Sequence, residues 1–173
     1  LITDMAPILS FTAEEVMSHL PSGLRAEEKT VFALKAKQSE FKLAEAELAT
    51  WKMLQTIREE VTSAIEPLRK QGVVGHALDT RVTIYGSHDI LNKLNALKTE
   101  HRALFIVSQL ILAPLAEAPQ NASRSEKLEG LAIGVEHAKG YKCERCWVYC
   151  EKIGEVPDYP TICPYCANIL KNG

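Results

Sequence analysis

The five cysteines are the residues whose type and spacing point most directly to chemistry, and all of them lie between Cys143 and Cys166. Cys143 and Cys146 form one C-x-x-C pair, Cys163 and Cys166 form another, and sixteen residues separate the pairs. Two residues between cysteines let a tight turn aim both sulfur atoms at one ion, and a second pair completes a tetrahedron. Because four thiolates leave no open position, the pattern predicts one structural Zn²⁺ ion and no Lewis-acid catalysis.

Other uses of the cysteines fit this pattern less well. A thioredoxin-like site needs a single pair on a βαβ scaffold. A disulfide framework would spread cysteines through the chain, whereas the first 142 residues have none. An iron–sulfur cluster uses the same ligands, so spacing alone leaves it open. We expect Cys150 to be a free thiol, although it could replace Cys146 as a ligand, and we expect His137 to be no ligand because it lacks ligand spacing.

Basic and aromatic residues are interleaved around the cysteines. In such a mixture, basic side chains can bind a phosphate and aromatic rings can stack on an unpaired base. Alternatively, the rings cover the metal site while the charged groups face water. The candidate RNA-binding residues are Lys142, Arg145, Trp147, Tyr149 and Lys152.

The composition is that of an ordinary globular protein. Of 173 residues, 46% are apolar and 24% are charged, which argues against intrinsic disorder. No apolar run reaches the ~20 residues that cross a bilayer, so we expect no membrane partner. The formal net charge is −2. A protein that neutralises many phosphates carries a basic surplus, so any RNA binding should involve few phosphate contacts and a shallow salt dependence.

The hydrophobic pattern divides the chain into three pieces. Residues 1–72 read as helical: Thr12 and Glu15 form a capping-box pattern, and a later stripe ends near Pro67, with Gly72 as the terminator. Residues 73–138 read as a small α+β unit, and residues 139–173 contain the cysteines. The stripe of the long helix comprises Leu43, Leu48, Trp51, Leu54, Val61, Ile65 and Leu68.

Within the middle piece, alternating β-branched residues over 80–85 predict a strand, and a helix capped by Ser87 or Asp89 should follow it. Residues 104–112 form an apolar run that suits a strand or a buried helical turn equally. A second strand is expected over 131–137 after an exposed connection. The fold class is therefore α+β in several parts, with a C-terminal zinc-ribbon-like finger built on four cysteines.

Several of these segments resemble isoleucyl-tRNA synthetases of the bacterial type. The resemblance rests on Met5–Val16 with His19-Leu-Pro, on residues 51–66 and 82–85, and on residues 104–109. Its most specific part is Lys142-Cys-Glu-Arg-Cys-Trp147 with the second C-x-x-C. That zinc module is shared with formamidopyrimidine-DNA glycosylases, but the helical segment in front favours the synthetases.

The resemblance implies a C-terminal region that starts inside the anticodon-binding helices. It implies that Cys143, Cys146, Cys163 and Cys166 bind zinc, and that the partners are isoleucine tRNA and the remaining domains of a monomeric, cytoplasmic class I ligase. That enzyme attaches isoleucine to tRNA using ATP. Neither its His-x-Gly-His nor its Lys-Met-Ser-Lys-Ser motif occurs here, so no catalytic residue is carried over. The alternatives are a structural brace that touches no RNA and a fragment of a DNA-repair glycosylase.

Overall fold

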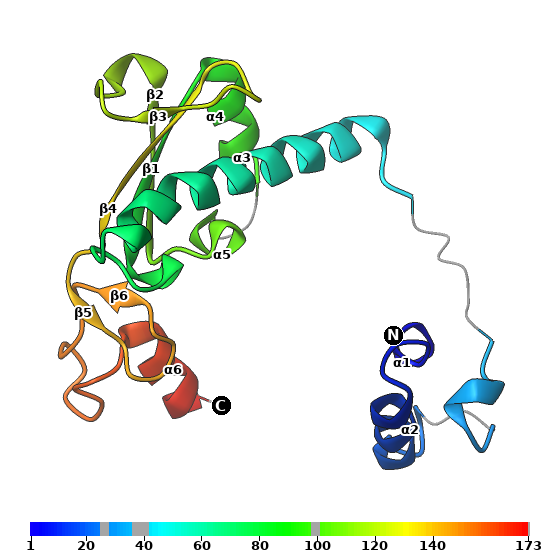
Figure 1. Cartoon of the computed structure of the whole chain (residues 1–173). Coiled ribbons are helices and arrows are strands. Elements are labelled where there is room, and N and C mark those ends of the chain that lie inside the picture. Colours follow the sequence, from blue (N-terminus) through cyan, green and yellow to red (C-terminus); the bar gives the residue numbers. More distant parts are fainter. Residues whose placement is uncertain (25–27, 36–41, 98–100, 173) are drawn as a thin grey trace. The chain divides into compact units, whose positions relative to one another are not determined.

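The computed structural model describes residues 1–24, 28–35, 42–97 and 101–172 (Figure 1). Its contacts divide the chain into an N-terminal unit, residues 1–44, and a C-terminal unit, residues 45–173. The long helix that we assigned to the first sequence piece therefore packs in the same unit as the sheet. This division differs from the expected boundary at residue 72 because the buried side of that helix is covered by strands.

The N-terminal unit consists of α1 (Ile2–Met5), α2 (Ser10–His19) and a 3-10 turn, η1 (Val31–Ala33). The expected capping box was wrong, because Thr12 lies inside α2, which begins two residues earlier. The carboxylate of Glu14 instead accepts hydrogen bonds from the Thr30 hydroxyl at 2.9 Å and the Val31 amide at 2.8 Å. These bonds hold η1 to α2 over a core of Ala6, Ala13, Met17 and Val31.

Helix α3 (Glu45–Lys70) carries the predicted apolar stripe only along its C-terminal half. Leu43 lies before α3, and Leu48 and Trp51 remain 45% and 46% exposed, so these three predicted stripe positions were wrong. The helix passes through Pro67 and ends one turn later, with Gly72 in the left-handed region at φ 73°. The predicted terminator is therefore confirmed. The buried residues of α3 are Leu54, Ile57, Val61 and Ile65.

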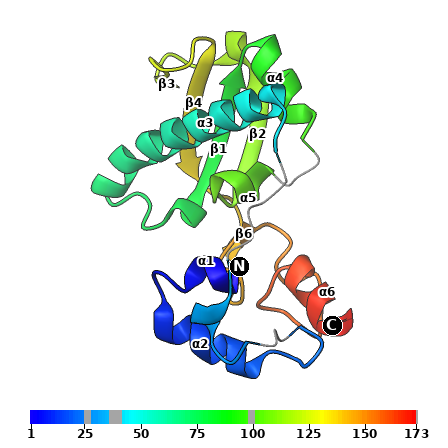
Figure 2. The same cartoon turned by 90° about the vertical axis from the view of Figure 1, so that its right-hand side faces the viewer.

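A four-stranded sheet with the order β2-β1-β4-β3 forms the centre of the C-terminal unit. Strands β1 (Thr80–Gly86) and β4 (Leu131–His137) agree with the two predicted strands and pair antiparallel. The short β3 (Ser123–Arg124) pairs antiparallel with β4 inside the expected connection. Helix α3 crosses one face of this sheet (Figure 2), where it packs on Val82, Ile84 and Ile133.

The connection from β1 to β2 resolves the ambiguous apolar run into two elements. After the 3-10 turn η2 (Ala77–Asp79) and β1, Ser87 caps α4 (His88–Asn95). The start of the apolar run over residues 104–112 lies in helix α5 (His101–Phe105), and its end lies in strand β2 (Gln109–Pro114). Strand β2 is parallel to β1, which requires such a helical crossover. A 3-10 turn, η3 (Leu115–Glu117), follows β2.

The last segment, residues 139–173, is called the finger below. It contains a hairpin of β5 (Tyr141–Lys142) and β6 (Tyr149–Cys150) and a terminal helix, α6 (Pro164–Asn172). The α+β class with a four-cysteine cluster near the C-terminus is therefore confirmed. Among the helices of the described residues, none combines the length and apolar character needed to cross a membrane.

The packing of α3 on the sheet predicts a large cost for truncating Ile57, whose side chain is fully buried. We expect Ile57→Ala to lower the free energy of unfolding by about 2–5 kcal/mol, because it leaves a cavity in a closed core. Leu48→Ala on the exposed part of the same helix is the control and should change stability by about 0.5 kcal/mol or less. Chemical denaturation of both variants measures the difference, and equal stabilities would contradict this packing.

Candidate metal centre

The sulfur atoms of Cys143, Cys146, Cys163 and Cys166 all lie within 4.8 Å of one another. Those of Cys146 and Cys163 are 3.8 Å apart. A tetrahedral zinc site with Zn–S bonds of about 2.3 Å places its sulfur atoms about 3.8 Å from each other. The chemistry and spacing of this donor set therefore fit one structural zinc ion.

Two local structures bring the cysteines together. In the first, the turn after β5 is closed by a hydrogen bond from the Trp147 amide to the Cys143 carbonyl at 2.9 Å. In the second, α6 begins at Pro164, a favoured first residue of a helix. Cys163 thus precedes the helix and Cys166 lies in its first turn, where the helix dipole favours negative charge. The amide of Cys163 donates to the Cys143 sulfur at 3.3 Å and ties the two structures together.

Backbone amides make one of the four thiols unusually acidic. Burial alone would raise the pKa of Cys143, but the amides of Cys146, Cys163 and Arg145 lower it to about 6. Burial, together with the neighbouring thiols, raises the pKa of Cys146 to about 12. Four ionised sulfur atoms at this separation repel one another, so a cation is needed to hold all of them as thiolates.

The structure separates the remaining cysteine and histidine from the cluster. Cys150 packs beside the cluster, but its sulfur is no member of the four-sulfur group and accepts a hydrogen bond from the Lys152 amide at 3.4 Å. His137 also lies outside the group. Its ring makes an edge-to-face contact with Tyr149, with centroids 5.1 Å apart. The candidate donor set is therefore formed by the other four cysteines.

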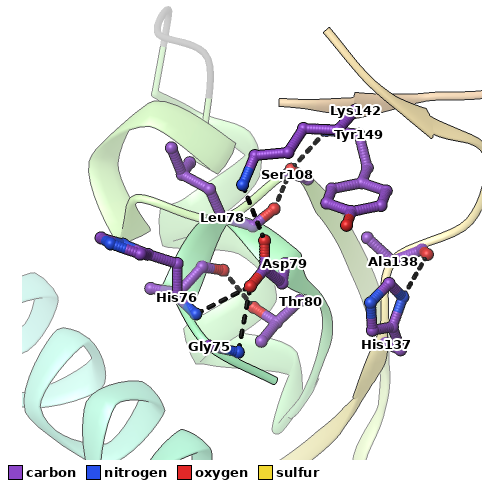
Figure 3. A network of polar contacts seen from close by, with 11 residues as sticks. Gly75, His76, Leu78, Asp79, Thr80, Ser108, His137, Ala138, Lys142 and Tyr149 are labelled. Carbon is purple, nitrogen blue, oxygen red and sulfur yellow. Dashed lines mark hydrogen bonds and ion pairs between the residues drawn. The ribbon is translucent and has the colours of Figure 1, made fainter. Parts of the chain in front are cut away.

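Ser108 joins the finger to the sheet (Figure 3). Its side chain is almost fully buried, and its hydroxyl donates to the Leu78 carbonyl while accepting from the Tyr149 amide at 2.8 Å. Nearby, Gly140 has φ 89°, and a Cβ atom there would lie 2.5 Å from the backbone of Cys150. Within the finger, the backbone at Gly140 therefore lies too close to that of Cys150 to leave room for a side chain.

Asp79 makes the second connection to the finger (Figure 3). One carboxylate oxygen accepts from the amides of Gly75 and His76 at 3.0 and 2.8 Å, and the other lies 3.5 Å from the Lys142 ammonium. Burial alone would raise the pKa of Asp79, but the two amides and Lys142 together hold that pKa below its ordinary value. One carboxylate thus positions both the turn that carries His76 and a lysine of the finger. No sequence pattern singled out Asp79 or Ser108.

The five candidate RNA-binding residues have different surroundings. Trp147 is 56% exposed, and the Lys142 ammonium lies 5.7 Å from its ring centroid. Together with His76, Cys143 and Glu144, these two residues line a hollow of about 410 Å³. Tyr149 is half-buried against the sheet, Lys152 is exposed, and Arg145 donates a hydrogen bond to the Cys166 sulfur at 3.6 Å. The structure brings Lys142 and Trp147 to one hollow, whereas Tyr149 and Arg145 make contacts within the protein.

Comparison with known proteins confirms the resemblance to isoleucyl-tRNA synthetases. Residues 140–169 match the model of the zinc finger found in FPG and IleRS. The chain is 50% identical to an isoleucine–tRNA ligase of Nitratidesulfovibrio vulgaris and 49% identical to one of Desulfovibrio desulfuricans, over 99% of its length in each case. A third such ligase, from Haemophilus influenzae, is 38% identical over the full chain. The chain spans only 18–19% of the length of these relatives.

The cluster geometry predicts different effects for two cysteine substitutions. Cys163→Ser should lower bound zinc and loosen the finger, because it removes one of four thiolates. Cys150→Ser is the matched control and should keep one zinc ion per chain. Metal analysis by mass spectrometry of the purified variants measures both. Full zinc retention in Cys163→Ser, or loss in Cys150→Ser, would refute the ligand assignment.

The contacts of Asp79 predict that it stabilises the C-terminal unit at neutral pH. Because its folded-state pKa is lowered, this stabilisation is complete at pH 7 and is lost progressively as the pH falls from the ordinary carboxyl pKa through that lowered value. Asp79→Asn should therefore cost about 1–3 kcal/mol of unfolding free energy at pH 7. The control is Glu136→Gln, which removes an exposed carboxylate paired with the half-buried Arg81 and should cost under about 1 kcal/mol. Equal costs in chemical denaturation would count against this role of Asp79.

Proposed function

We propose that this chain, which is similar over almost its whole length to isoleucine–tRNA ligases, is a tRNA-binding segment of such an enzyme, stabilised by zinc. The whole enzyme, a class I synthetase, attaches isoleucine to its tRNA in the cytoplasm with ATP. This segment contributes binding and no catalytic residue, so alone it is inactive. Its partners are isoleucine tRNA and the remaining domains of a monomeric enzyme. The zinc ligands are Cys143, Cys146, Cys163 and Cys166.

The observation that carries this proposal is the hollow at the metal cluster. Trp147 follows the cluster's first C-x-x-C pair directly in the chain and keeps more than half of its surface exposed. Ring faces of this kind stack unpaired bases, and a neighbouring ammonium such as that of Lys142 attracts phosphate. Zinc provides the folding free energy that holds Trp147 at this place, because the finger has few large apolar side chains of its own.

We assign the three sequence pieces complementary roles. Residues 1–72 and 73–138 hold the anticodon arm, and the finger, residues 139–173, contacts unpaired nucleotides. Lys152 is an exposed cation beside the finger's hairpin, so we retain it as a phosphate contact. For Arg145 and Tyr149 the proposed role is indirect, since their side chains orient the metal cluster and the hairpin.

A titration of the zinc-loaded chain with isoleucine tRNA tests this proposal. We expect preferential binding of isoleucine tRNA over a non-cognate tRNA, and we expect a chelator to abolish the preference because the finger loses its structure. Trp147→Ala should weaken binding at least about fivefold, in line with the loss of one stacked base. Fluorescence anisotropy with labelled tRNA measures these affinities.

The control for Trp147 is Tyr165→Ala, which removes a 63% exposed ring of α6 that does not line the hollow. It should leave the affinity unchanged. Equal binding of both tRNAs, with and without metal, would favour the structural brace instead. A preference for duplex DNA over tRNA would favour the relation to the DNA glycosylases.

A further inference from the structure

Two residues other than glycine have a positive φ in the described part of the chain: Ile106 at 56° and Trp147 at 65°. This region is sterically unfavourable for side chains with a Cβ atom, and most of all for a β-branched residue such as isoleucine. Both side chains are also large, apolar and 46% and 56% exposed, respectively. Backbone strain and exposed apolar surface thus coincide at two places, and strained positions of this kind cluster at ligand sites.

Ile106 occupies a position where the chain elsewhere uses glycine. At the end of α5, the Ile106 amide donates to Ala103 and the Val107 amide to Arg102, which is a Schellman motif. Helix α3 ends in the same motif with Gly72 at the equivalent position. Since the half-exposed side chain of Ile106 gains only part of the free energy of burial, isoleucine makes this helix end less stable than glycine would.

The side chain of Ile106 borders a second hollow, about 380 Å³ in volume, beside α3. Phe105 and Ile106 line it on one side, and Arg58 and Arg69 of α3 contribute guanidinium groups. His76 lines this hollow and also the one at Trp147. The two strained residues therefore border adjoining hollows that share one exposed imidazole.

The charges of the second hollow suit a polyanion better than an apolar protein segment. Arg69 is paired with Glu66 at 3.0 Å, but Arg58 has no ion-pair partner among the residues that the structure describes. An exposed guanidinium beside an apolar wall offers one group for a phosphate and one surface for a base. In the first hollow, Lys142 lies beside the Trp147 ring, although its ammonium is also 3.5 Å from Asp79 and Glu144 contributes a carboxylate to the lining.

We infer that the RNA strand that contacts Trp147 continues past His76, so that an unpaired nucleotide packs on Ile106 and its phosphate pairs with Arg58. This inference rests on the proposed function and extends the RNA contact from the finger to α3 and the end of α5. It assigns a binding role to Ile106, His76 and Arg58, which no motif in the sequence marks.

Ile106→Gly provides the principal test. Glycine suits the left-handed position, so the variant should be at least as stable as the unmodified chain in chemical denaturation. Its affinity for isoleucine tRNA should nevertheless fall about threefold or more, because a base loses its packing surface. A variant that is stable and binds with unchanged affinity would overturn the inference, and so would a variant that loses stability while binding normally.

Arg58→Gln gives an independent readout. It should weaken binding and reduce the slope of log affinity against log salt by roughly one, as expected for one lost phosphate contact. Lys93→Gln removes the same charge from α4 and should change neither quantity. If the unmodified chain binds tRNA and Trp147→Ala weakens it, but the salt slope of Arg58→Gln is unaltered, the inference fails while the proposed function stands. If the unmodified chain does not bind tRNA, the proposed function itself fails.

Discussion

Four sulfur atoms within 4.8 Å of one another are the constraint on which the C-terminal part of this protein depends. Without a cation, their ionised forms repel each other, and the amides that favour the thiolate of Cys143 increase that repulsion. With zinc, the same arrangement becomes a source of folding free energy. The short hairpin and the nine-residue α6 have too little apolar surface to pack stably without the metal. The metal therefore fixes the position of Trp147.

The finger and the sheet are coupled through polar groups rather than through a shared apolar core. The hydroxyl of Ser108 and the carboxylate of Asp79 each contact both parts, and both residues are buried. Such contacts are directional, so they fix orientation more strictly than apolar packing does. This matters for the binding surface that we propose, made of His76 from the sheet side and Lys142 and Trp147 from the finger, because its two halves must keep a constant distance.

The sequence allowed the metal cluster, strands β1 and β4 and the end of α3 at Gly72 to be predicted, because each depends on a local pattern. The sequence pattern wrongly predicted that Leu48 and Trp51 are buried. A helix longer than the sheet it covers carries apolar residues beyond the edge of the core. The helical crossover to β2 was ambiguous because an apolar run has no periodicity when it is divided between two elements. Asp79 and Ser108 were missed since their partners lie far away in the chain.

The spacing of the cysteines also bears on the order in which the finger assembles. The amide–sulfur contact between Cys163 and Cys143 closes a segment of 20 residues, whereas Ser108 bonds to residues 30 and 41 positions away. Closing a shorter segment costs less chain entropy, and short-range contacts form sooner during folding. These separations favour metal capture as the local and early event, with attachment to the sheet after β2 has paired with β1. A chain still emerging from its ribosome must expose the finger up to Cys166 before the four-sulfur group can be completed.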